Sequence, residues 1–315
     1  MKRIVVTGAS GFLGRHLMPV LAEHYPDAEI TGLSRADYDL MEPSQVDLMF
    51  KELKPEILIH LAAYSGGIGA NRMYPADFYY QNTLLTALMF ERAAKNNVKK
   101  MLYPMGGCSY PATATSPIDE SQMWNGYPQP ESAGYSTAKK MGIVASISYR
   151  QQYGLNSVVI IPGNMYGEYD NFRLQESHVI PAMIRRFYEA KLNSVKTVEM
   201  WGTGKPQRDF VYAGDVAKLI PRFIEEYNSS DPVNVSSGTT TSIRELAETI
   251  AELMGYQGEI VWDTSKPDGQ MIKIFDVRKL NSLGMQCSTP LREGLRKTIN
   301  WFMEHYEKRT DGIRL

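Results

Sequence analysis

The feature that most constrains the fold of this chain is a glycine-rich turn close to its N-terminus. The turn reads Thr7-Gly8-Ala9-Ser10-Gly11-Phe12-Leu13-Gly14 and directly follows a β-branched run over residues 2–7. Gly8 and Gly11 allow a tight turn and a close approach of the backbone to a pyrophosphate, and Gly14 lets the next helix pack on a sheet. Because a strand precedes the turn and an amphipathic helix follows it, the pattern predicts a dinucleotide-binding unit with phosphates at the helix N-terminus.

Beyond this turn, short apolar runs alternate with helical patterns. Strands are expected at 29–33, 57–61, 100–105 and 157–161, and helices at 43–53, 75–96 and 132–153. Such alternation gives a parallel sheet with right-handed crossovers. The predicted fold class is therefore α/β, a doubly wound parallel (Rossmann) sheet with a smaller, interleaved C-terminal α/β substrate domain.

The regular alternation ends near Pro162, where loops rich in Gly, Pro and Asn begin. Helices are expected at 179–191, 242–254 and 290–305, and a late strand at 233–235 is expected to rejoin the sheet. We therefore assign residues 1–163 to a dinucleotide-binding domain with a return near 209–236. Residues 164–208 and 237–315 are assigned to the substrate domain.

Composition narrows the class of protein. The 315 residues carry a formal net charge of −1, which argues against nucleic acid or an anionic membrane as a partner. No apolar run is long enough to cross a bilayer. The two cysteines, Cys108 and Cys287, lie far apart, which is typical of a reducing cytoplasm. The cysteine usage therefore predicts a cytoplasmic protein. The histidines lack metal-ligand spacing, so no metal site is predicted.

The end of the second expected strand indicates which dinucleotide is bound. An NAD site usually has a carboxylate there, but this chain reads Gly32-Leu33-Ser34-Arg35. A guanidinium suits the 2′-phosphate of NADP, so NADP(H) is the predicted cofactor. The alternative is that Arg35 is a solvated loop charge.

Tyr135 and Lys139 are four residues apart and share one face of the expected helix at 132–153. A free phenol has a pKa of about 10, and a neighbouring ammonium is expected to lower it by stabilising the phenolate. Alone, this spacing is typical of surface chemistry or packing. Following a sheet built on the glycine turn, it predicts a proton donor beside a nicotinamide ring.

Several longer segments carry a specific resemblance. They read Gly66-Gly67-Ile68-Gly69-Ala70-Asn71, Tyr74-Pro75-Ala76-Asp77-Phe78, Asn164-Met165-Tyr166-Gly167, Ser177-His178-Val179-Ile180-Pro181, Trp201-Gly202-Thr203-Gly204 and Ser265-Lys266-Pro267-Asp268-Gly269. With them, the chain resembles the extended short-chain dehydrogenase/reductases, and within these the GDP-L-fucose synthase branch, along almost its whole length. The resemblance implies NADPH, a GDP-linked 4-keto-6-deoxymannose, epimerisation at C3 and C5, and reduction at C4. It also implies a homodimer formed through the helices at 75–96 and 132–153.

The resemblance also implies roles for individual residues. Cys108 and His178 match the positions of the acid and base that invert C3 and C5, and a thiol and an imidazole both exchange protons near neutral pH. Cofactor contacts are implied for Gly8, Ser10, Gly11, Phe12, Leu13, Arg35, Leu61, Ala62, Ala63, Tyr135, Lys139, Pro162, Asn164, Met165 and His178. Substrate contacts are implied for Asn164, Arg186, Trp201, Arg208 and Lys273. Guanidinium groups suit a pyrophosphate, and the indole of tryptophan offers a flat apolar face.

One position departs from the branch. A serine or threonine is expected four residues before the tyrosine of Cys108-Ser109-Tyr110-Pro111, but this chain has Gly106. Losing such a hydrogen-bond donor commonly lowers the rate about a hundredfold to a thousandfold. Ser109, Thr113 or an ordered water could replace it, and Ser109 is counted among the candidate catalytic residues.

Gly106 leaves four functions open. They are a bifunctional epimerase/reductase, a C3/C5 epimerase without reduction, a C4-reductase or epimerase of another nucleotide sugar such as a GDP-heptose or GDP-octose, and a non-catalytic NADP-binding sensor. The joint presence of Tyr135, Lys139, Cys108 and His178 argues against the sensor, which needs none of them. A 4,6-dehydratase is disfavoured because Gly107-Cys108 offers no acidic group.

Overall fold

The computed structural model describes residues 2–308 and 314–315. Its centre is a six-stranded sheet in the order β10-β5-β4-β3-β1-β2, in which every neighbouring pair is parallel. The strands are β1 (Arg3–Thr7), β2 (Glu29–Leu33), β3 (Ile57–His60), β4 (Lys100–Pro104), β5 (Ser157–Pro162) and β10 (Val233–Val235). The expected parallel sheet and its late sixth strand are therefore confirmed.

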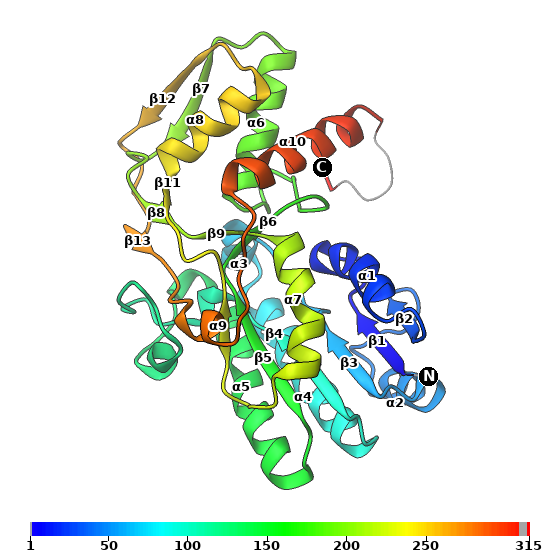
Figure 1. Ribbon diagram of the computed structural model, residues 1–315. Helices are drawn as coiled ribbons and strands as arrows, with labels where there is room; N and C mark the ends of the chain where they lie inside the picture. Colours follow the sequence, from blue (N-terminus) through cyan, green and yellow to red (C-terminus); the bar gives the residue numbers. More distant parts are fainter. Residues whose placement is uncertain (1, 309–313) are drawn as a thin grey trace.

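Side chains from alternate strand residues enter two different apolar clusters, one on each face of the sheet. In β1, Ile4 and Val6 pack with α1 (Phe12–His24) and α7 (Ala213–Glu226), whereas Val5 enters the opposite cluster. That second cluster contains residues of α2 (Pro43–Leu53), α4 (Pro75–Lys95) and α5 (Ala133–Tyr153). The two-residue repeat of a strand produces this division, and Figure 1 shows helices on both faces of the sheet.

A third apolar cluster lies away from the central sheet. It joins α6 (Val179–Leu192), α8 (Ile243–Met254) and α10 (Leu291–Lys308). Strand β7 (Thr197–Trp201) pairs in parallel with β12 (Glu259–Asp263) beside these helices, in the upper part of Figure 1. This region is the observed counterpart of the predicted substrate domain, and the exact division of the chain into two domains stays a prediction.

Short elements connect the two regions. Strand β6 (Asn164–Tyr166) pairs with β9 (Phe210–Tyr212), and β8 (Gln207–Arg208) pairs with β11 (Thr241–Ser242) and β13 (Ile272–Lys273). The remaining helices are α3 (Ile68–Met73), α9 (Arg278–Ser282) and the short 3₁₀ turns η1 (Gly107–Ser109), η2 (Glu120–Trp124) and η3 (Pro130–Ser132). Leu280 of α9 packs in the same cluster as β10, so the chain returns to the sheet once more after residue 237.

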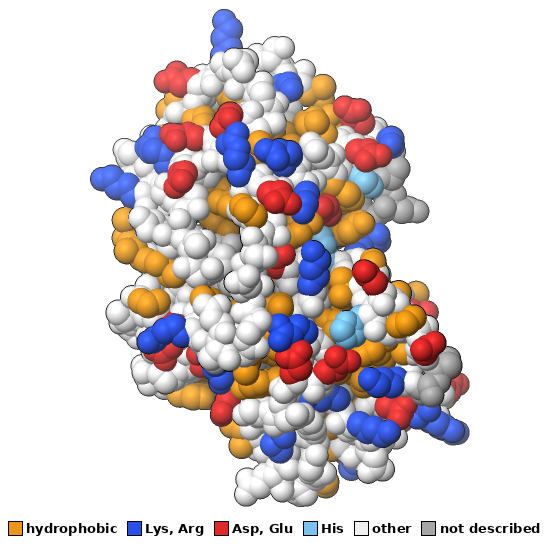
Figure 2. Space-filling view, viewed as in Figure 1, with side chains coloured by type: hydrophobic (Ala, Val, Ile, Leu, Met, Phe, Trp, Pro, Cys, Tyr) orange, Lys and Arg blue, Asp and Glu red, His pale blue; other side chains and the backbone are white. Residues whose placement is uncertain are grey.

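Two surface properties are relevant to partners. Among the helices of the described residues, none is both long and apolar enough to span a membrane. Basic and acidic side chains are intermixed over the face drawn in Figure 2, without a large patch of one sign.

Candidate active site

The turn between β1 and α1 has the geometry of an anion cradle. Gly8 has a φ of +72°, and a Cβ placed on it would lie 2.7 Å from the amide nitrogen of Ala62. A Cβ on Gly14 would lie 2.4 Å from the carbonyl oxygen of Gly8. Helix α1 begins after Gly11 without a side-chain cap, so its first N–H groups are available to a ligand. The turn thus fits a dinucleotide pyrophosphate.

The segment after β3 lies beside this cradle. The Leu61 amide donates to the carbonyl oxygen of Thr7 at 3.1 Å, and the Ala62 amide donates to Thr7 Oγ1 at 3.3 Å. These bonds place Leu61 and Ala62 next to the glycine turn, and the contact of residues 61–63 with a cofactor stays a prediction. Leu13 is buried in the core, so only its backbone could contact a cofactor. Ser10 is exposed at the rim and Phe12 is half-buried.

Arg35 follows β2 and is exposed. The neighbouring Asp37 carboxylate accepts from both the amide and the hydroxyl of Ser34, each at 2.7 Å. These bonds lower the pKa of Asp37. Within residues 2–308 and 314–315, Arg35 has no hydrogen-bond or ion-pair partner. Its guanidinium is therefore available for a phosphate, as the prediction of NADP(H) requires.

The chain brings a thiol and a phenol together where β4 ends. A Cβ placed on Gly106 would lie 3.2 Å from Cys108 Sγ and 3.7 Å from the Tyr135 hydroxyl. Cys108 comes from η1 and Tyr135 from the first turn of α5. The Phe78 ring meets the Tyr135 ring edge-on, with 6.1 Å between centroids. Two of the predicted catalytic residues thus face each other across Gly106.

The electrostatics of this pair differ from the sequence expectation. Burial raises the pKa of the Tyr135 phenol, and a negative charge on Cys108 raises it further. Burial lowers the pKa of Lys139 to about 7, and its ammonium lies 3.9 Å from the centroid of the Tyr103 ring. Burial is the largest influence on Tyr135, so in the protein alone its pKa is raised and not lowered as expected from the nearby Lys139.

Gly106, Gly107 and Ser109 surround the thiol, and the structure constrains each of these small residues differently. Gly106 has extended backbone angles, φ −101° and ψ 144°, which any residue adopts. A Cβ on Gly107 would instead lie 2.4 Å from Phe275 Cζ, so packing requires glycine there. Ser109 has no exposed surface, and its hydroxyl has no hydrogen-bond partner among the described residues. Ser109 is thus enclosed by the chain itself, and its role in place of the missing hydroxyl stays a prediction. Thr113 is exposed and lies beside Gly126.

His178 lies just before α6 and is exposed. The preceding segment is fixed to the loop after β3, because the Gly67 amide donates to the carbonyl oxygen of Glu176 at 2.7 Å. The charge of His178 acts on the buried carboxyl of Asp170, whose pKa is raised by burial. In the described part of the chain, no hydrogen bond joins His178 to Cys108 or Tyr135. Its predicted partnership with Cys108 stays a prediction.

The predicted contact residues after β5 are held by the backbone around them. The side-chain Nδ2 of Asn164 donates to the carbonyl oxygen of Asp209 at 2.8 Å, which ties β6 to the residue just before β9. Met165 is half-buried against the sheet cluster. The carbonyl oxygen of Pro162 would be 3.3 Å from a Cβ on Gly107, so Pro162 lies beside the thiol loop.

Two of the predicted substrate residues line a common pocket of about 110 Å³. It is lined by Trp201, Gly204, Pro206, Arg208, Ile243, Pro267, Asp268 and Gly269. Trp201 is 65 % exposed, so one face of its indole is open. Arg208 Nη1 donates to the carbonyl oxygens of Gln207 and Gln270 at 2.8 and 2.5 Å, which fixes the guanidinium at the pocket wall. Lys273 is beside Arg208 in the β13–β8 pairing, whereas Arg186 lies on α6 outside this pocket.

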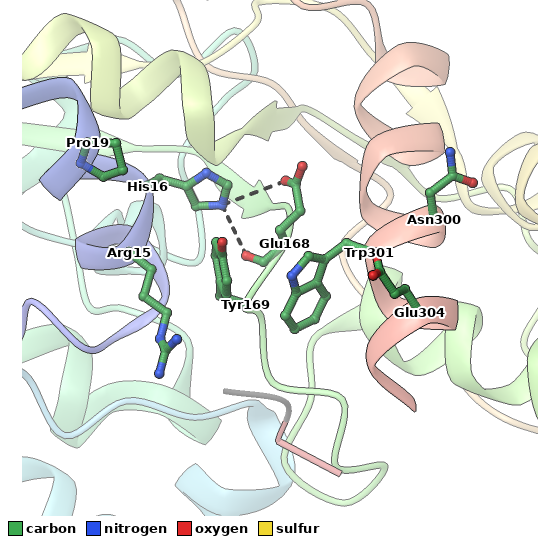
Figure 3. A pocket seen from close by; sticks show the side chains of 8 residues that line it. All are labelled: Arg15, His16, Pro19, Glu168, Tyr169, Asn300, Trp301 and Glu304. Carbon is green, nitrogen blue, oxygen red and sulfur yellow. Dashed lines mark hydrogen bonds and ion pairs between the residues drawn. The ribbon is translucent and has the colours of Figure 1, made fainter. Parts of the chain in front are cut away.

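A larger cavity of about 400 Å³ lies between α1 and α10 (Figure 3). It is lined by Arg15, His16, Pro19, Glu168, Tyr169, Asn300, Trp301 and Glu304. His16 Nε2 lies 3.0 Å from the carbonyl oxygen of Glu168, and the imidazole points toward Glu168 in Figure 3. None of the predicted catalytic or substrate residues lines this cavity, so it is not the candidate active site.

Comparison with known proteins decides the family. The model of the NAD dependent epimerase/dehydratase family matches residues 4–236. The chain belongs to this family. The match covers the glycine turn, the Cys108–Tyr135 pair and all six strands of the central sheet.

Relatives within the family share most of this chain's length. GDP-L-fucose synthase from Escherichia coli is 36 % identical over 316 residues, covering 98 % of both chains. The crystal structure of a GDP-L-fucose synthetase from Naegleria fowleri bound to NADP superimposes with a TM-score of 0.91 at 27 % identity, covering 100 % of this chain and 96 % of that one. GDP-mannoheptose C4 reductase from Campylobacter jejuni with NADP bound gives a TM-score of 0.87 at 28 % identity, covering 96 % and 98 %.

Sequence reasoning missed two residues that shape the site. The Asp209 carboxylate accepts from the Ser237 amide and hydroxyl and from the amides of Gly238 and Phe275. It thereby holds Phe275, whose ring packs on Gly107. Asp209 directly follows Arg208, so that motif was the available signal for it. No local pattern indicated Phe275, because its contact joins segments far apart in the sequence.

Proposed function

We propose that this NADP-dependent family member is an epimerase/reductase of a GDP-linked 4-keto-6-deoxy sugar, similar to GDP-L-fucose synthase. Cys108 and His178 invert C3 and C5, and Tyr135 then donates a proton as C4 is reduced. One observation carries the proposal: Cys108 Sγ and the Tyr135 hydroxyl lie 3.2 and 3.7 Å from the same point, a Cβ position on Gly106. A single sugar ring bound next to this point could contact both groups.

The chemistry follows from the substrate's ketone. A C4 carbonyl acidifies the C–H bonds at C3 and C5, so a base on one face of the ring removes a proton and an acid on the other face returns one. The Cys108 thiolate and the His178 imidazole take these roles. Bound NADPH supplies the hydride for C4. Burial keeps the phenol of Tyr135 protonated until the reduced oxygen accepts its proton.

Recognition of the nucleotide falls to the pocket around Trp201. The open face of its indole suits the guanine ring, and Arg208 suits the diphosphate. The turn at Gly8, with Arg35 and the backbone of residues 61–63, holds the cofactor.

Gly106 supports a second candidate, a C4-reductase or epimerase acting on a larger GDP sugar such as a heptose or octose. The missing side chain leaves room beside the thiol and the phenol for an additional group on the substrate. A C3/C5 epimerase without reduction is the third candidate, because the carbonyl lacks the hydroxyl donor usual in the family.

One incubation separates these candidates. The protein, NADPH and GDP-4-keto-6-deoxymannose are mixed in deuterated water, and deuterium at C3 and C5 is measured together with NADPH oxidation. Exchange with oxidation supports the synthase, and exchange alone supports the epimerase. Absence of both rules out that substrate and directs the same assay to GDP-4-keto-heptoses.

We also infer that the protein forms a homodimer through α4 and α5, which pack side by side. Met141, Val144 and Ile147 on α5 are 39–48 % exposed, and Tyr80 on α4 is 62 % exposed. This apolar face suits a second copy of the same helix pair, because a two-fold axis makes identical faces complementary. A cytoplasmic location stays a prediction.

A further inference from the structure

Lys273 lies at the edge of the candidate site, next to Arg208. Lys273 ends β13, pairs with Arg208 in β8, and accepts a hydrogen bond at its carbonyl oxygen from the Asp209 amide at 3.1 Å. Over residues 2–308 and 314–315, its Nζ makes no hydrogen bond or ion pair. Burial and the charge of Arg208 both lower the pKa of Lys273. An unpaired ammonium in such a place is costly unless it serves a ligand or a neighbouring anion.

The ring of Phe275 connects this ammonium to the thiol loop. Lys273 Nζ lies 5.8 Å from the centroid of the Phe275 ring. The same ring contacts the backbone at Gly107, where an added Cβ would be 2.4 Å from Cζ. Gly107 is bonded directly to Cys108, so the Phe275 ring lies between the ammonium and the backbone of the loop that carries the thiol. In agreement, a negative charge on Cys108 acts to raise the pKa of Lys273, opposing the effect of burial.

The other titratable groups facing Cys108 come from α5. Tyr135 is neutral, since burial raises its pKa. A negative charge on Cys108 also acts to raise the pKa of Lys139. The Lys139 ammonium lies over the Tyr103 ring, however, and its pKa of about 7 leaves it only partly charged at neutral pH. Lys273 comes from β13, so lysines of two different elements adjoin the loop that carries the thiol.

We infer that Lys273 stabilises the thiolate of Cys108 and acts as a positioning residue for its proton chemistry, in addition to facing the diphosphate. In this role it keeps the sulfur ionised, and so able to accept a proton, without itself touching the sugar carbon. The C–H bond of the substrate breaks, its electron pair moves into the enolate, and the proton passes to the sulfur. The inference rests on the proposed function for this step alone, because the thiolate itself is measurable without substrate.

The test follows alkylation of Cys108 by iodoacetamide, which reacts with thiolates. The protein has only two cysteines, so Cys287→Ala leaves Cys108 as the sole thiol. Rates are measured between about pH 6 and about pH 10, where a free thiol with a pKa near 8.5 changes from neutral to ionised. Lys273→Met removes the charge, Lys273→Arg keeps it, and Lys266→Met removes an exposed lysine 5.8 Å from the Trp201 ring as a control.

The expected result is a rate at pH 7 that falls at least about threefold in Lys273→Met and stays within about twofold of the parent in Lys273→Arg and Lys266→Met. Near pH 10 all variants should alkylate equally, because every thiol is then ionised. An unchanged rate at pH 7 in Lys273→Met overturns the inference. An equal loss at pH 7 and pH 10 also overturns it, since that pattern means altered access.

Two further measurements keep the result decisive. Melting temperatures show whether the variants are folded, and Lys273→Gln replaces Lys273→Met if the latter is not. In the parent, about 1 M KCl shortens the screening length to about 3 Å and should slow alkylation at pH 7 more than at pH 10.

If deuterium exchange fails while this pattern holds, the sugar substrate is wrong and the role of Lys273 stands. If exchange occurs without the pattern, the role of Lys273 falls and the proposed function stands.

Discussion

Gly106 and the Tyr135 hydroxyl face each other with room for one small side chain between them. A Cβ on Gly106 would be 3.7 Å from that hydroxyl and 3.4 Å from Tyr135 Cε1, which is ordinary contact. Its distance of 3.2 Å from Cys108 Sγ requires a shift of a few tenths of an ångström. The extended backbone at Gly106 places no further restriction on the residue. The fold therefore does not require glycine at this position.

Gly106→Ser is expected to fold and to speed C4 reduction of GDP-4-keto-6-deoxymannose about tenfold or more, because the new hydroxyl can donate to the carbonyl. Single-turnover oxidation of NADPH measures this rate. The matched control is Gly107→Ser, which should lower the melting temperature strongly, since its Cβ would meet Phe275 Cζ at 2.4 Å. A folded Gly106→Ser variant with an unchanged or lower rate contradicts the prediction.

Tyr135→Phe is expected to abolish hydride transfer while leaving deuterium exchange at C3 and C5 intact. The hydroxyl makes no hydrogen bond in the described part of the chain, so its loss should leave the packing of the ring on Phe78 unchanged. Exchange by NMR and NADPH oxidation are measured on the same sample. Full-rate reduction by the variant would exclude Tyr135 as the proton donor.

Arg35→Ala is expected to weaken NADPH binding at least about tenfold and to leave NADH binding within about twofold, because only NADPH carries the 2′-phosphate. Fluorescence titration with both coenzymes gives the two dissociation constants. Arg15→Ala is the control, since Arg15 Nε donates to the carbonyl oxygen of Ser10 at 3.0 Å and its guanidinium lies over Tyr169. Equal weakening for both coenzymes would argue against a phosphate contact at Arg35.

Lys139→Met is expected to stabilise the protein at neutral and acid pH while abolishing activity. Burial lowers the pKa of Lys139 from 10.5 to about 7, so between these values the unfolded chain holds a proton that the folded chain has lost. The unfolding free energy of the parent therefore rises with pH across this window, by about 1.4 kcal/mol per unit at most. The advantage of Lys139→Met is greatest below pH 7 and vanishes near pH 10.5. Urea unfolding at several pH values tests this, and an advantage independent of pH would refute it.

Val144→Lys is expected to convert the proposed dimer into a monomer by placing a charge in the apolar face of α5. Sedimentation velocity at micromolar concentration reports the change. Leu192→Lys is the control, because Leu192 is 64 % exposed at the end of α6 and lies outside the α4–α5 face. A parent protein that is already a monomer would disprove the dimer.

Local pattern predicted much of the fold. The glycine turn, the β-branched runs and the helix starting near Ser132 lie within a few residues of β1, α1, β3, β4, β5 and α5. Helix α7 was missed, because Pro221 lies inside it and interrupts the helical pattern. Strands β7 and β12 were also missed, since their pairing joins segments about 60 residues apart and has no local signal.

By itself the sequence determined the alternating α/β architecture, the dinucleotide turn and the placement of Tyr135 and Lys139 on one helix face, because periodicity and short spacings encode them. Tertiary structure alone decided that Cys108 meets Tyr135 across Gly106, that Ser109 is buried, and that the Lys273 ammonium lies near the Phe275 ring. The folded chain also raises the pKa of the Tyr135 phenol, which the sequence predicted to be lowered. The pKa of a group depends on how much water the surrounding chain removes. Contacts and desolvation of this kind arise only when distant segments close around the site.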